Sequence, residues 1–149
     1  EYARSIGAAV IGLTCCPGSE IDRIADVGIA PAPGPEVITG STRMKSGTAQ
    51  KMVLNMLSTG TMIKLGKVYG NLMVDVKPSN LKLIDRCVSI VQNATGVSRD
   101  EAKEVLDQCD YRPKTAIVMI ENHVDEQAAI AALQQAGGHV SAAIATARA

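Results

Sequence analysis

The residues best suited to chemistry lie in one segment, residues 34–51, which reads GPEVITGSTRMKSGTAQK. It joins a turn rich in glycine and hydroxyl side chains to the start of a long amphipathic helix. Ser41 or Thr42 could cap free backbone N–H groups there, and a helix N-terminus favours phosphate and other oxyanions. Glu36 precedes Ser41 by five residues, so a carboxylate lies near the same helix end. The segment predicts a local anion site, although one Ser-Thr pair by itself would indicate only a capped helix.

Anion binding must be local, because the chain as a whole carries no excess charge. Its 149 residues include 15 Lys and Arg and 15 Asp and Glu, so neither nucleic acid nor an anionic membrane is an expected partner. There are three Tyr and no Phe or Trp, which leaves no stacking platform for bases or for the apolar face of a sugar. A sugar would have to be recognised by hydrogen bonds.

The four cysteines predict no metal site. Cys15, Cys16, Cys87 and Cys109 form neither a C-x-x-C pair nor a Cys/His set at zinc spacing. We expect reduced thiols in a cytoplasmic protein. The pair Cys15-Cys16 could be reactive, but small buried cysteines after a strand are commoner, and we assign them no role. The sequence also shows no signal peptide and no apolar run long enough for a membrane helix, which predicts a soluble protein.

The first half of the chain predicts a βαβ unit that is incomplete by itself. Residues 8–14 and 26–30 are short apolar runs typical of buried parallel strands, and residues 19–25 between them predict a short helix. A long helix is expected from about residue 42 to 65. Two parallel strands leave edges and apolar faces uncovered, and the chain opens at Glu1 without Met. We therefore expect a fragment that needs the rest of its sheet or a partner chain.

The second half predicts amphipathic helices after an ordered connector over residues 66–78. Ser98 and Glu101 match the capping-box spacing, and Pro113 suits a first helical turn. Further start and stop signals are Ser79 or Asn80, Asp125, the pair Gly137-Gly138, and Ser141. The predicted domains are residues 1–78 and a small all-α bundle over residues 79–149.

Residues 34–51 resemble the signature shared by N-acetylmuramic acid 6-phosphate etherases and the glucokinase regulatory protein. The similarity continues through residues 51–86, KMVLNMLSTGTMIKLGKVYGNLMVDVKPSNLKLIDR. Residues 94–120, ATGVSRDEAKEVLDQCDYRPKTAIVMI, also resemble the helical C-terminal region of the etherases. The resemblance covers nearly the whole chain, and many positions of its central motif match together.

The resemblance implies an α/β fold: the C-terminal part of a doubly wound parallel-sheet sugar isomerase (SIS) domain, followed by a small helical bundle similar to ubiquitin-associated (UBA) domains. The etherases cleave the lactyl ether of N-acetylmuramic acid 6-phosphate to give N-acetylglucosamine 6-phosphate and D-lactate in peptidoglycan recycling. In the family, lactate leaves after proton abstraction at C2, and water then adds. The implied partners are a phosphorylated amino sugar and a second copy in a homodimer, with no metal and no organic cofactor.

The resemblance implies substrate-binding residues but no catalytic residue in this chain. The family's acid-base glutamates and serine loops correspond to sequence upstream of Glu1, so the fragment alone is predicted to be inactive, and Glu36 is not taken as the general base. Similarity to isomerase domains of glucosamine-6-phosphate synthase implies sugar contacts at Glu36, Thr39, Ser41 and Thr42. The segment that begins at Asn80 resembles a part of the glucokinase regulatory protein that reaches a sugar phosphate, which implicates Asn80 and Lys82.

Arg86 joins these residues because it lies four residues after Lys82. A helix would place both cations on one face, where they could hold a phosphate dianion, although a solvated basic face remains open for Arg86.

Two other functions remain open at this point. The chain could belong to a regulatory module that binds a phosphosugar, as the glucokinase regulatory protein and SIS-domain transcription factors do. The helical tail could be a protein-interaction module, as its UBA-like pattern suggests. Paired glutamates upstream would favour the enzyme, whereas a DNA-binding helix-turn-helix or a second SIS copy would favour regulation.

Overall fold

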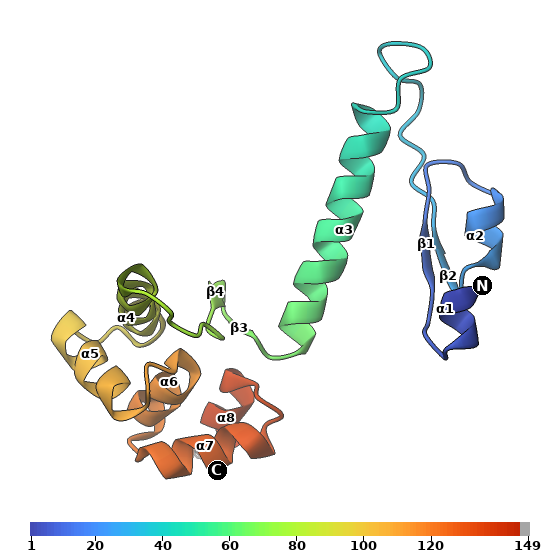
Figure 1. Ribbon diagram of the computed structural model, residues 1–149. Helices are drawn as coiled ribbons and strands as arrows, with labels where there is room; N and C mark the ends of the chain where they lie inside the picture. The colour runs from blue at the N-terminus through green and yellow to red at the C-terminus, as the bar shows by residue number, and fades with distance from the viewer. Residues whose placement is uncertain (147–149) are drawn as a thin grey trace. The chain divides into compact units, whose positions relative to one another are not determined.

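The computed structural model describes residues 1–146 and shows a mixed, helix-rich α/β protein (Figure 1). The chain divides into two compact units, Glu1–Thr59 and Gly60–Ala149, and each is described here by itself. Over the described range, no helix has both the length and the apolar character needed to cross a bilayer.

The first unit contains the predicted βαβ motif. Its elements are α1 (Tyr2–Ser5), β1 (Ile11–Leu13), α2 (Glu20–Ile24) and β2 (Val27–Ile29), and β1 pairs with β2 in parallel with Gly12 opposite Gly28. Gly12 lets α2 lie close to the strand, because a Cβ atom there would be 2.7 Å from the carbonyl oxygen of Ile21. The motif was predicted correctly, although both strands are shorter than the apolar runs.

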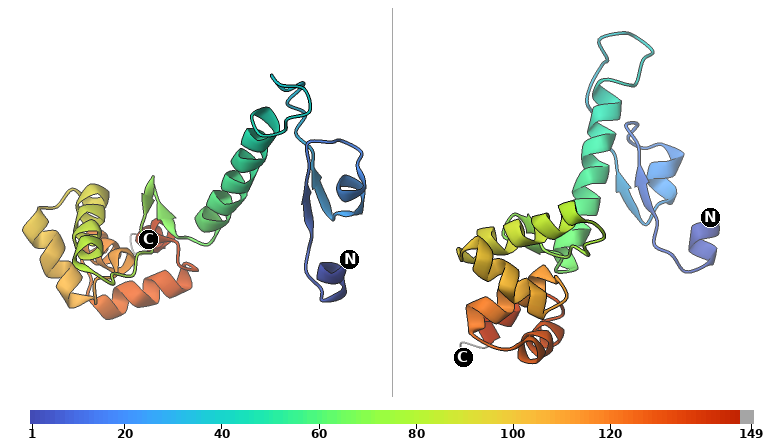
Figure 2. Two further views of the ribbon diagram at one scale, coloured as in Figure 1. Left: turned by 45° about the horizontal axis from the view of Figure 1, so that its top comes forward. Right: turned by 60° about the vertical axis from the view of Figure 1, so that its left-hand side comes forward.

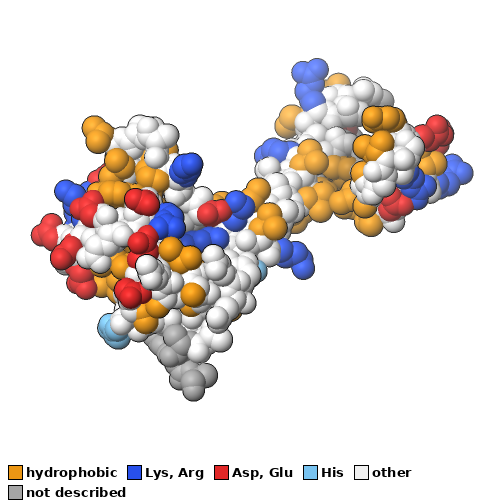
Figure 3. Space-filling model, turned by 60° about the horizontal axis from the view of Figure 1, so that its bottom comes forward, with side chains coloured by type: hydrophobic (Ala, Val, Ile, Leu, Met, Phe, Trp, Pro, Cys, Tyr) orange, Lys and Arg blue, Asp and Glu red, His pale blue; other side chains and the backbone are white. Residues whose placement is uncertain are grey.

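The prediction that these strands are buried on both faces is wrong for this unit. Ile11 is 50% exposed and Val27 is 53% exposed. The reason is physical: one short helix can cover only part of a two-stranded sheet. Figure 3 shows apolar side chains gathered on the surface of this unit, whereas charges of both signs are interspersed over the helical unit.

The long helix α3 (Lys45–Lys64) begins three residues later than the sequence predicted. Every residue of α3 is at least partly exposed, including large apolar residues. The exposed members are Met52, Leu54, Met56, Leu57, Met62 and Ile63. A helix surface of this kind is normally covered in a complete protein.

In the second unit, a β-hairpin follows the end of α3, where the sequence predicted only an ordered connector. Strands β3 (Val68–Tyr69) and β4 (Leu72–Met73) pair antiparallel across a two-residue Gly70-Asn71 turn. Gly70 has a φ of 58°, which glycine adopts without a steric penalty. The hairpin was missed because each strand is only two residues long.

Five helices follow: α4 (Leu81–Thr95), α5 (Arg99–Gln108), α6 (Pro113–Asn122), α7 (Glu126–Gln135) and α8 (Val140–Thr146). Three predicted caps are confirmed. The side chain of Asn80 accepts the N–H of Leu83 at 3.0 Å, Ser98 accepts from Glu101 at 3.2 Å, and Asp125 accepts from Ala128 at 2.8 Å. Pro113 occupies the first turn of α6, as expected.

Helix α6 is central to this unit and packs against α4, α5, α7 and α8. Figure 2 shows α4–α8 gathered into one cluster in both views. Val74, directly after the hairpin, is 0% exposed and belongs to the same core. The compact units therefore divide at residues 59 and 60, earlier than the boundary predicted after residue 78, because hairpin residues pack into the helical core.

Candidate functional site

The loop that carries the predicted sugar contacts follows the carboxyl end of β2. The start of α3 lies near the corresponding end of β1, because the Sγ atom of Cys15 is 3.7 Å from the backbone oxygen of Ser46. In parallel α/β sheets, ligands bind outside the carboxyl ends of the strands. The loop is therefore located where such a fold places its ligands.

Glu36 caps helix α3. Its two carboxylate oxygens accept the backbone N–H groups of Lys45 at 3.0 Å and Ser46 at 3.1 Å. The same two bonds, in that order, hold the pKa of Glu36 below its ordinary value. A carboxylate that is stabilised in its charged form is a poor general base, which agrees with leaving Glu36 out of the catalytic role.

The helix end that was predicted to bind an external anion is therefore occupied by the carboxylate of Glu36. Over residues 1–146, neither the Ser41 nor the Thr42 side chain hydrogen-bonds these first-turn amides, so the prediction that one of them caps the helix is wrong. A carboxylate reaches the amides from nine residues away because the intervening loop folds back on the helix start. The amides are occupied, and the hydroxyl groups remain available for other partners.

The four predicted sugar contacts of this loop line one hollow of about 340 Å³. Its lining consists of Pro35, Glu36, Thr39, Gly40, Ser41 and Thr42. Three side-chain hydroxyls and a carboxylate thus border the same space. Glu36 has lone pairs left after capping, because an ionised carboxylate offers about four acceptor positions. The hollow can therefore hydrogen-bond a polyhydroxylated ligand.

The remaining predicted residues lie at the start of α4 in the second unit. Asn80 uses its side-chain oxygen as the helix cap, which leaves its amide N–H groups as donors. Lys82 and Arg86 are exposed and one helical turn apart. Within the part of the chain that the structure describes, neither forms an ion pair, whereas the neighbouring Asp85 pairs with Arg99.

An ion cluster in the second unit was not foreseen from the sequence. Asp75 lies 2.6 Å from Lys67 and 4.0 Å from Lys114, and these cations, led by the hydrogen bond from Lys67, lower the pKa of its carboxyl. The cluster joins the hairpin to α6. The Gly70-Asn71 turn was the signal that could have placed Lys67 near Asp75.

The cysteines differ in their surroundings. Cys87 and Cys109 are buried, and burial raises the pKa of both thiols, which makes them unreactive. Cys16 is exposed, so the expectation of a buried pair at residues 15 and 16 is wrong for this residue. In residues 1–146, no three His, Cys, Asp or Glu residues are grouped so as to hold a metal ion.

Comparison with known proteins agrees with the resemblance seen in the sequence. The proteins named N-acetylmuramic acid 6-phosphate etherase in Cronobacter sakazakii and in Aliivibrio fischeri are each 54% identical to this chain over 144 residues. The protein of that name in Clostridium botulinum (strain Loch Maree / Type A3) is 53% identical over the same length. Each alignment covers 97% of this chain but 48% of the relative, so the chain spans about half the length of the curated relatives it matches.

A family model matches the second half of the chain directly. It describes the C-terminal lid domain of glucokinase regulatory protein and covers residues 70–148, just over half of the chain. The match takes in β4, the helices α4–α8 and the residues Asn80, Lys82 and Arg86. On the evidence of these residues, the chain belongs to the family of the glucokinase regulatory protein C-terminal lid domain.

Proposed function

We propose that this chain is the C-terminal part of an N-acetylmuramic acid 6-phosphate etherase. The complete enzyme cleaves the lactyl ether of its substrate to give N-acetylglucosamine 6-phosphate and D-lactate. One observation carries the proposal: proteins with this name are 54% identical to the chain over 97% of its length.

The loop hollow of the first unit binds hydroxyl groups of the sugar in this proposal. Thr39, Ser41 and Thr42 can donate or accept hydrogen bonds there, and the spare lone pairs of Glu36 accept from a sugar hydroxyl. The absence of Phe and Trp from the chain suits recognition by hydrogen bonds rather than by stacking. Glu36 has a positioning role as well, because it fixes the start of α3.

The second unit has its own phosphate-binding groups at the start of α4 in this proposal. Lys82 and Arg86 project cations from adjacent turns of the helix, and the amide of Asn80 adds N–H donors. Charge-assisted hydrogen bonds from such groups are about twice as strong as neutral ones. Since neither cation is engaged by a carboxylate of the described residues, no internal ion pair must break before phosphate binds.

Proton transfer is assigned to the part of the relatives that this chain does not span. The carboxylate in the hollow, Glu36, has a lowered pKa and two backbone partners, so it is poorly suited to removing a proton from carbon. This chain alone is then inactive, while it contributes to affinity for the phosphosugar in the longer protein.

The same proposal extends to the fold and the assembly. We propose that the βαβ unit belongs to a doubly wound parallel SIS sheet, that the helical unit is UBA-like, and that the protein is a homodimer. The exposed apolar side chains of β1, β2 and α3 support a larger sheet or a second copy that covers them. Four free cysteines suit a cytoplasmic protein of cell-wall recycling.

The test uses a full-length enzyme that contains this chain. Ser41→Ala and Lys82→Ala should each raise KM for N-acetylmuramic acid 6-phosphate about tenfold, the effect of losing one hydrogen bond to a charged or tightly held group. Ser58→Ala and Lys103→Ala, which alter exposed residues elsewhere, serve as matched controls. Unchanged KM in both test variants would remove these residues from the binding site.

A second candidate function is a regulatory module that binds a phosphosugar without cleaving it. The match of residues 70–148 to the lid domain of glucokinase regulatory protein favours it. Binding of N-acetylmuramic acid 6-phosphate by the full-length protein with no release of D-lactate would select this function over the etherase.

A further inference from the structure

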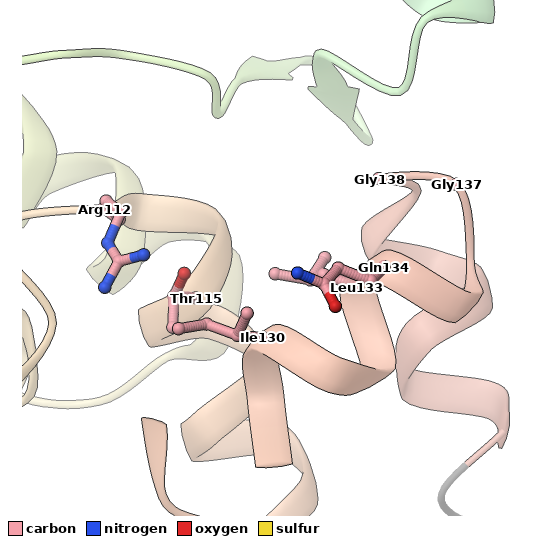
Figure 4. Close-up of a pocket in the computed structure, with 7 residues that line it drawn as sticks. All are labelled: Arg112, Thr115, Ile130, Leu133, Gln134, Gly137 and Gly138. Atoms are coloured by element: carbon pink, nitrogen blue, oxygen red, sulfur yellow. The ribbon is translucent and has the colours of Figure 1, made fainter. Parts of the chain in front are cut away.

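The chain has two further features that take no part in the proposed sugar contacts. One is a cavity of about 390 Å³ between α6 and α7, shown in Figure 4. Arg112, the charged residue of its lining, already pairs with Glu126 and lies 4.0 Å from Asp110, so its charge is balanced within the fold. The other feature is the adjacent pair Cys15-Cys16 of the first unit. Its two thiols are the groups whose chemistry is still unassigned.

The four cysteines of the chain divide into an accessible pair and two buried residues. Cys16 is exposed and Cys15 is partly exposed, whereas Cys87 and Cys109 are buried, which raises the pKa of both thiols. A cysteine reacts with an oxidant through its thiolate, so burial of this kind protects it. Oxidation of this chain should therefore begin at Cys16.

The loop that carries the pair follows the carboxyl end of β1. A longer sheet would place strands beside β1 and helices over its faces, but the carboxyl ends of parallel strands stay open because ligands bind there. The loop also fixes Cys16. Its backbone N–H donates to the Thr14 hydroxyl at 3.1 Å, and its carbonyl oxygen accepts the N–H of Ser19 at 3.2 Å. Cys16 is thus held at an edge that an oxidant can reach.

We propose that a peroxide oxidises Cys15 and Cys16 to a reversible disulfide between the two adjacent residues. The thiolate of Cys16 attacks one oxygen of hydrogen peroxide, the O–O bond breaks, and a sulfenic acid and one water form. The sulfur of Cys15 then attacks the sulfenic sulfur, and the hydroxyl group leaves with the Cys15 proton as a second water. Two thiols lose two electrons to the peroxide, and the products are one disulfide and two waters.

A disulfide between adjacent residues is strained and therefore reversible. Neighbouring Cα atoms are about 3.8 Å apart across a trans peptide, which is closer than the roughly 4.4–6.8 Å usual between disulfide-bonded residues. Strained or exposed disulfides are reduced easily, so a small thiol can restore both cysteines. The bond is a modification rather than a structural link, which agrees with four free cysteines in the reduced protein.

Oxidation also removes a contact at the start of α3. In the reduced protein, the thiol of Cys15 donates to the backbone oxygen of Ser46 at 3.7 Å, and a disulfide has no S–H to donate. The backbone N–H of Ser46 is one of the two that Glu36 accepts, and Glu36 lines the loop hollow. The disulfide should therefore loosen the first turn of α3 and the carboxylate anchored there, whichever ligand the hollow takes.

The first test treats a full-length protein that contains this chain with hydrogen peroxide, alkylates the remaining thiols after unfolding, and digests it with trypsin. Trypsin releases residues 5–23, in which Cys15 and Cys16 are the only cysteines. The mass of this peptide should fall by two hydrogen atoms without alkylation, and dithiothreitol should reverse both changes. The two buried cysteines should be alkylated fully. An unmodified peptide, or a sulfenic or sulfinic acid at Cys16 beside an alkylated Cys15, would overturn the proposal.

The second test measures amide hydrogen exchange at Lys45 and Ser46 in the same protein, and it needs no etherase activity. Peroxide should raise the exchange rates about threefold, the effect of losing one weak hydrogen bond. Cys16→Ser keeps the contact of Cys15 with Ser46 but prevents the disulfide, so peroxide should leave its exchange unchanged. Cys15→Ala should exchange faster even without peroxide. A disulfide that leaves exchange unchanged, or the same peroxide effect in Cys16→Ser, would refute the link to α3.

Discussion

Replacing Val74 by Ala tests whether the hairpin region is part of the helical core. Val74 is 0% exposed, and its backbone N–H donates to Lys67 across the hairpin at 3.1 Å. The change removes two buried methyl groups at about 0.8 kcal/mol each, and the cavity left behind adds to this loss. The second unit should therefore lose about 2 kcal/mol of unfolding free energy, and its Tm should fall by about 10 °C.

The assay is urea and thermal unfolding of the 149-residue chain, followed by near-ultraviolet circular dichroism of Tyr69 and Tyr111, which both belong to the second unit. Val37→Ala is the matched control, because the same two methyl groups are removed from a residue that is 79% exposed. The control should change stability by less than about 0.5 kcal/mol. If Val74→Ala changed the unfolding free energy no more than this control, the hairpin would not belong to the core.

Two further predictions concern the backbone. Because the pKa of Glu36 is lowered in the fold, its cap on α3 should be present above the ordinary glutamate pKa and be lost as the pH falls through the lowered value. Amide hydrogen exchange at Lys45 and Ser46, corrected for intrinsic rates, should show this loss of protection as the pH falls. Glu36→Gln should abolish the pH dependence of the protection. The same pH dependence in Glu36→Gln would contradict the cap. Gly66→Ala should destabilise the second unit more than Gly96→Ala: both glycines have positive φ, but a Cβ at Gly66 would lie 2.8 Å from a backbone oxygen of the α7–α8 turn, whereas Gly96 has open space. Equal losses of unfolding free energy in urea would show that the turn between α7 and α8 accommodates the added Cβ atom without a loss of stability.

The helical unit was largely readable from the sequence because its signals are local. Asn80, Ser98 and Asp125 cap helices that begin directly after them, and each bond spans three residues. The strands of the first unit were harder to judge. An apolar run is buried only when neighbouring elements cover it. The residues around Ile11 do not show which elements cover the strand, and Ile11 is in fact half exposed.

The predicted sugar contacts stay a prediction, and the sequence did not show how they are arranged. The resemblance led to Glu36 and Ser41, and the structure places both on the same hollow. The capping of α3 by Glu36 was hidden, because it links residues nine and ten positions apart through an irregular loop.

The central claim, that this chain is the binding half of an etherase, is tested most directly by release of D-lactate from N-acetylmuramic acid 6-phosphate. A full-length protein that contains this chain should release D-lactate and N-acetylglucosamine 6-phosphate in equal amounts, while the 149-residue chain alone releases neither. Turnover by the 149-residue chain alone, or no D-lactate from the full-length protein under conditions where it binds the sugar phosphate, would contradict the account.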